Sequence, residues 1–110
     1  MANHYEETVL VTAPLMTLVE KMRQIQGFKI LSELSDGAGG VVFRIDKGIS
    51  MATWGHDITV HMSIHDDQRT KVELESKSAL KTQVVDWGKN KKNVKEIEEQ
   101  LFAGCAVETV

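Results

Sequence analysis

The sequence has few of the residues that carry disulfide, membrane or nucleic-acid chemistry. Its single cysteine, Cys105, excludes an internal disulfide and fits a reducing compartment, so we expect a cytoplasmic protein. No apolar run approaches the roughly 20 residues of a membrane-spanning helix, and we expect no secretory signal, because no basic region precedes an apolar core. The net charge of −3 creates no field that attracts nucleic acid or an anionic membrane, so we expect neither partner.

Signatures of common enzymes are also missing. There is no nucleophile elbow, phosphate-binding loop or dinucleotide fingerprint. The glycine-rich segment 35–40 precedes a predicted strand, whereas a phosphate cradle needs the N-terminus of a helix there. His61 and His65 lie four residues apart in an alternating strand, where that spacing covers about 13 Å and one metal ion cannot reach both rings. We therefore expect no metal and no cofactor.

What the sequence does contain is a clear hydrophobic pattern, which predicts one domain at 1–104 and a C-terminal tail at 105–110. Apolar residues alternate in six segments, as is typical of half-buried strands, and recur at helical spacing in two others. The predicted strands span 5–12, 28–34, 41–46, 49–54, 58–64 and 70–77, and the predicted helices span 15–25 and 84–102.

Turn chemistry fixes the expected register of the last four strands. The turn segments are Asp46-Lys47-Gly48, Gly55-His56 and Asp66-Asp67-Gln68. The first pairs Phe43 with Met51, the second pairs Met51 with Val60, and the third pairs Val60 with Leu74. These registers agree on one apolar sheet face, which also includes Ile64. We therefore predict an α+β fold with the order β-α-β-β-β-β-β-α, in which two helices cover one face of an antiparallel meander.

The element order resembles that of the helix-grip superfamily, the Bet v 1 and START-like domains. The shared features are a first strand, a helix, a run of antiparallel strands and a long C-terminal helix, although this chain is shorter. The resemblance implies an apolar ligand between the sheet and the last helix, or an enzyme, but no motif transfers a catalytic residue. The segments Trp54-Gly55 and Asp86-Trp87-Gly88-Lys89-Asn90 also resemble features of small uncharacterised bacterial domains.

The first functional hypothesis is a non-catalytic binding or interaction domain. Its ligand would be an apolar small molecule in a modest pocket between sheet and last helix, or a protein partner on the exposed sheet face. The expected ligand-binding residues are Trp54, Trp87, Met51, Met62 and Val94. Self-association into a homodimer is also plausible, because a small sheet offers unpaired backbone at its edges.

Two alternatives remain open. The first is a small helix-grip-like enzyme that uses His61, Glu73 or Asp86 as its acid or base, with His61 opposite Glu73 in the expected register. That hypothesis requires a cleft, so it loses support if these residues lie on an open, solvated face. The second is an anion-binding module at the start of the last helix. Its residues would be Lys89, Lys91, Lys92 and Lys95.

Overall fold

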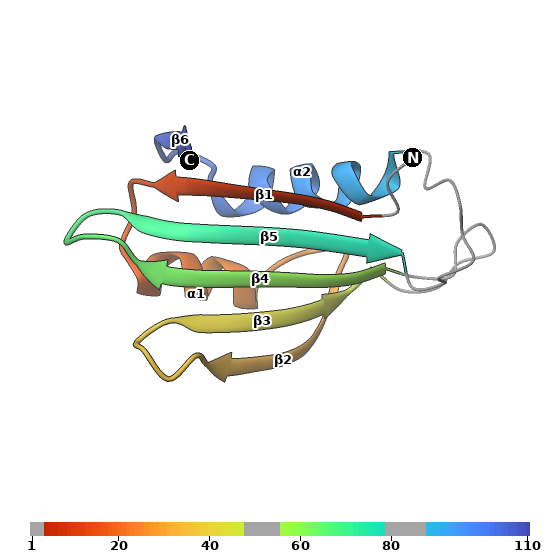
Figure 1. Cartoon of the computed structure of the whole chain (residues 1–110), viewed down its shortest axis with the longest axis horizontal. Helices are drawn as coiled ribbons and strands as arrows, with labels where there is room; N and C mark the ends of the chain where they lie inside the picture. The colour runs from red at the N-terminus through yellow and green to blue at the C-terminus, as the bar shows by residue number, and fades with distance from the viewer. Residues whose placement is uncertain (1–3, 48–55, 79–87) are drawn as a thin grey trace.

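Alternating apolar segments pair into an antiparallel sheet of six strands in the computed structural model, which describes residues 4–47, 56–78 and 88–110 (Figure 1). The strand order is β2-β3-β4-β5-β1-β6. The strands are β1 (His4–Val11), β2 (Lys29–Ser35), β3 (Val41–Asp46), β4 (His56–Ile64), β5 (Thr70–Ser78) and β6 (Val107–Thr109), and the helices are α1 (Leu15–Arg23) and α2 (Lys89–Leu101). The predicted α+β class is confirmed. Neither described helix is long and apolar enough to cross a membrane.

Both helices lie on the same side of the sheet (Figure 1), where α2 contacts β1 and β5 and α1 contacts β4. Each helix carries an apolar stripe, and the alternating strands present a matching apolar face. The largest fully buried side chains come from both layers and include Leu18, Met22, Phe43, Ile45, Ile58, Met62, Leu74, Ile97 and Leu101. No described helix covers the opposite sheet face, which is therefore the open face of the molecule.

The hairpin of β4 and β5 has the register that its turn predicts. Val60 lies opposite Leu74, and His61 lies opposite Glu73. The side chain of Asp66 fixes the turn by accepting hydrogen bonds from the backbone N–H groups of Gln68 and Arg69. Ile64 was expected on the buried face, but its side chain is 64% exposed.

The expected position of the segment 49–54 between β3 and β4 is wrong. β3 pairs directly with β4, with Phe43 opposite Val60, so Met51 cannot pair with either of them in the expected register. The other edge of β4 is occupied by β5. The predicted strand at 49–54 itself lies outside the described residues. The alternation of β3 matches that of 49–54, so the hydrophobic pattern could not decide which of them lies beside β4.

The C-terminal segment is more ordered than the expected tail. Val107–Thr109 forms β6 and pairs with the end of β1, where Val11 lies opposite Val107. Lys21 on α1 fixes the segment that precedes β6, because its Nζ donates hydrogen bonds to the carbonyl oxygens of Leu101 at 3.3 Å and Ala103 at 3.1 Å. The three residues of β6 are exposed, so their pairing comes from the backbone and leaves no apolar pattern in the sequence.

Buried polar side chains anchor the start of α2 beneath β5. Ser76 is fully buried and its hydroxyl donates to Asn90 Oδ1 at 2.8 Å. Asn93 is also buried and its amide lies 3.5 Å from the same hydroxyl oxygen. Because buried polar groups need partners, this contact fixes the helix against the sheet more specifically than apolar packing alone.

The hairpin of β2 and β3 is packed against β4 in a way that permits only glycine at position 40. A Cβ atom there would lie 2.6 Å from the carbonyl oxygen of Met62 and would also overlap the Asp36 carboxylate. We expect Gly40→Ala to lower the free energy of unfolding by about 1–3 kcal/mol, because neither neighbour is free to move. Urea denaturation measures the change. Ala38→Ser, at an exposed position in the same loop, should change it by less than about 0.5 kcal/mol, and equal effects would contradict the packing argument.

Candidate functional site

The predicted apolar ligand residues that the structure describes are in the core. Met62 on β4 and Val94 on α2 are each 0% exposed. A ligand could reach them only by displacing packed side chains, which costs free energy. Trp54, Trp87 and Met51, like the alternative catalytic residue Asp86, lie outside the described residues.

The predicted lysine cluster is divided between different environments. Lys95 points to β1, where its Nζ lies 2.9 Å from Glu7 Oε2, and it also lies 3.3 Å from Glu98 Oε1. Lys89 is half-buried, whereas Lys91 and Lys92 are exposed. Lys95 is therefore already neutralised by carboxylates, and the cluster does not present four equivalent cations to an anion.

The open face contains an acidic hollow over β1, β4 and β5. Glu6 on β1 lies directly opposite Glu75 on β5, and Thr59 on β4 lies opposite Glu75 on its other side. The hollow has a volume of about 160 Å³. Its lining residues are Glu6, Glu7, Thr8, Thr59, His61, Glu73, Leu74 and Glu75. Like charges that face each other across paired strands are destabilising, so this arrangement does not help the chain to fold.

His61 lies at one side of the hollow and is held in a fixed orientation. Its Nε2 lies 2.8 Å from Asp36 Oδ2, and its Nδ1 lies 3.4 Å from Glu73 Oε1. The hydrogen bond with His61 and two further ones from the backbone N–H groups of Ala38 and Gly40 lower the pKa of Asp36 to about 2. Asp36 therefore remains ionised and orients the ring. His61 and Glu73 are 32% and 45% exposed, as expected of an open face.

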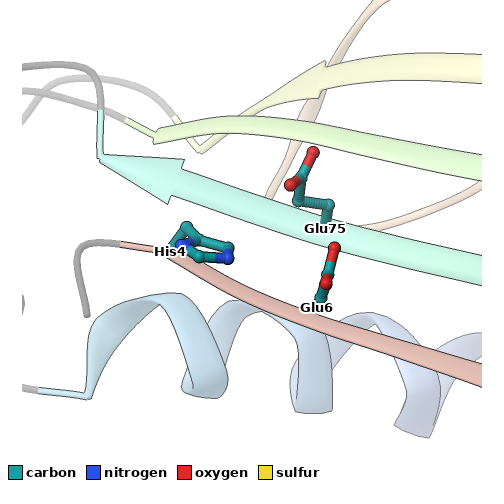
Figure 2. Close-up of side chains that lie close together, drawn as sticks. All are labelled: His4, Glu6 and Glu75. Atoms are coloured by element: carbon teal, nitrogen blue, oxygen red, sulfur yellow. The ribbon is translucent and has the colours of Figure 1, made fainter.

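A second group at the hollow could hold a metal ion. One ligand atom each of His4, Glu6 and Glu75 lies within 4.8 Å of the others. Figure 2 shows that His4 and Glu6 come from β1 and that Glu75 comes from β5. The sequence did not predict this group, because the group depends on the pairing of β1 with β5 and no local sequence pattern predicts that pairing.

On the other side of β1, the carboxyl groups of Glu7 and Glu98 share a hydrogen bond. Burial and the neighbouring Glu7 raise the pKa of Glu98 to about 7. The hydrogen bond from Glu98, together with those from Tyr5 and Lys95, lowers the pKa of Glu7 to about 2. Below neutral pH, Glu98 therefore keeps its proton and donates a hydrogen bond to the ionised Glu7, and this bond attaches α2 to β1.

The chain matches no protein-family model, no curated protein and no solved structure. The resemblance in element order to helix-grip domains therefore stays a prediction.

The bond between Glu98 and Glu7 predicts a stability that depends on pH. The folded state raises the pKa of Glu98 from 4.5 to about 7, so its contribution is present below pH 4.5 and is lost as the pH rises through 7. The lowered pKa of Glu7 changes the stability only below pH 4.5. We expect unfolding free energy to fall by about 1–2 kcal/mol between pH 5 and pH 8 through Glu98.

Urea denaturation of Glu98→Gln at the same two pH values tests this prediction. Glutamine does not titrate, so that part of the pH dependence should disappear. Glu99→Gln changes the exposed neighbour on the same helix and should behave as the wild type. The assignment fails if both variants keep the wild-type difference between pH 5 and pH 8.

Proposed function

We propose that this chain is a non-catalytic binding domain that binds a small cation in the acidic hollow of its open face. The observation that carries the proposal is the direct opposition of Glu6 and Glu75 across β1 and β5. Two carboxylates in this position repel each other, and a cation between them converts the repulsion into attraction.

The size and the electrostatics of the hollow support a small ligand. Its volume of about 160 Å³ is below the roughly 300–1,000 Å³ of pockets for drug-sized molecules. The nearest lysines are weak competitors, because Lys77 lies 3.8 Å from Glu75 and Lys71 lies 3.8 Å from Glu73, both at exposed positions. Such surface pairs contribute about 0–1 kcal/mol and are readily displaced.

The alternatives receive less support from the same geometry. An apolar ligand that bound at Met62 or Val94, the two predicted ligand residues that the structure describes, would have to displace packed core side chains. Acid–base catalysis by His61 and Glu73 would take place on an open face, without the exclusion of water that strengthens electrostatic catalysis.

Removing one of the opposed carboxylates should raise stability while it weakens binding. We expect Glu75→Gln to increase the free energy of unfolding by about 0.2–1 kcal/mol, since it relieves the repulsion with Glu6. Thermal and urea denaturation measure this change. Asp67→Asn removes the same charge from the exposed β4–β5 turn and should be neutral within about 0.5 kcal/mol. A Glu75→Gln variant that is less stable than the wild type would show that Glu75 is retained for the fold.

Binding is tested with spermidine, a small polycation, followed by two-dimensional NMR at low and high salt. We expect chemical-shift changes concentrated on the open face of β1, β4 and β5, with an affinity that falls as salt rises. The double variant Glu6→Gln/Glu75→Gln should weaken binding by about three- to tenfold, and Asp67→Asn should leave it within about twofold. Shifts spread over the whole surface, or insensitive to the double variant, would refute the proposed function.

A further inference from the structure

A second histidine, His4, lies beside two lining residues of the acidic hollow, Glu6 and Glu75. His4 and Glu6 are alternate residues of β1 and therefore point to the same face, and Glu75 lies opposite Glu6 on β5. Their side chains gather at the end of β1 that begins with His4 (Figure 2). Among the residues that the structure describes, this is the one group of three histidine, cysteine or acidic side chains whose ligand atoms lie this close together.

We infer that these three residues, at the edge of the hollow, form a binding site for a divalent transition-metal ion, with Zn²⁺ as the best fit. The ligands are one ring nitrogen of His4 and one carboxylate oxygen each of Glu6 and Glu75. The inference rests on the proposed function and names the cation more closely.

The donor set selects the metal. An imidazole nitrogen with two carboxylate oxygens suits Zn²⁺, Co²⁺ or Mn²⁺, whereas Mg²⁺ and Ca²⁺ prefer oxygen ligands alone. Three protein ligands also leave the fourth position of a tetrahedral zinc ion for water. The ion would neutralise Glu6 and Glu75, whose opposition across the two strands gives the fold no benefit.

The geometry requires only a small adjustment. Ligand atoms of a tetrahedral zinc site lie about 3.4 Å apart, given bonds of about 2.0–2.2 Å, and here they lie within 4.8 Å of one another. His4 and Glu6 are exposed, so torsional rotations can close the difference without moving the core. The backbone positions are fixed by the ladder between β1 and β5, which keeps the three side chains on one face.

The His61 group is a weaker candidate for the same ion. Its Nε2 is occupied by Asp36 at 2.8 Å, so only Nδ1 is available, beside Glu73. A metal held there would have one histidine and one nearby carboxylate. We therefore assign His61 to the wall of the hollow and His4 to the metal.

Isothermal titration calorimetry of the chelator-washed full chain tests the inference, with Zn²⁺ and Mg²⁺ as separate probes. We expect one Zn²⁺ per chain and at least about tenfold weaker Mg²⁺ binding, because magnesium gains nothing from the imidazole. His4→Ala and Glu75→Gln should each weaken Zn²⁺ binding by at least about tenfold. The matched controls His65→Ala and Asp67→Asn, at exposed positions beyond the far end of β4, should stay within about twofold of the wild type.

The possible outcomes distinguish the zinc site from the proposed cation-binding function. Zinc binding that survives His4→Ala, or that falls equally with His65→Ala, means that zinc binds elsewhere and overturns the inference. The inference is also overturned if calorimetry detects no zinc binding while spermidine still changes the NMR chemical shifts of the open face. The proposed function then stands. If neither cation binds, both are refuted. Circular dichroism checks the fold of each variant, and His4→Gln repeats the test with a side chain that keeps polar character but lacks the ring nitrogen.

Discussion

The pairing of β1 with β5 is the constraint on which the rest of the structure depends. It joins the first strand of the chain to the last strand of the meander, and it is stabilised by buried contacts such as Val9 opposite Val72. Closing so long a loop costs conformational entropy, which the burial of apolar surface between the sheet and the helices offsets. The same pairing places β1 beneath α2, leaves its outer edge to β6, and brings Glu6 to Glu75.

The two faces of the sheet have separate roles. The helix side holds a packed core, in which the predicted ligand residues Met62 and Val94 are fully buried. The open side carries the polar side chains that alternate with the core residues along the same strands. The carboxylates that face each other there repel, so selection for stability alone would not keep them. A functional role is the usual reason for such a local conflict, since natural proteins sacrifice some stability at their sites.

The sequence patterns predicted which side of the sheet a residue faces better than they predicted which strands pair with each other. The alternation of β4 and β5, with the short turn at Asp66, determined their register, and the helical stripes determined which sheet face is covered. Alternation does not say which strand lies beside which, and 49–54 was therefore placed wrongly next to β4. For the same reason His4 and Glu6 could not be connected with Glu75. The contact of Asp36 with His61 had a weak local signal, an acidic residue in a glycine-rich turn, but its partner on β4 had none.

Adjacent positions on β1 place carboxylates on both faces of the sheet. Glu6 belongs to the acidic hollow, while Glu7 lies on the helix side and accepts a hydrogen bond from Glu98. The two side chains are neighbours in the chain yet face opposite sides, because successive residues of a strand point to opposite faces. One short stretch of strand therefore sets an acidic group facing another carboxylate on the open side and a second one paired with Lys95 beneath α2.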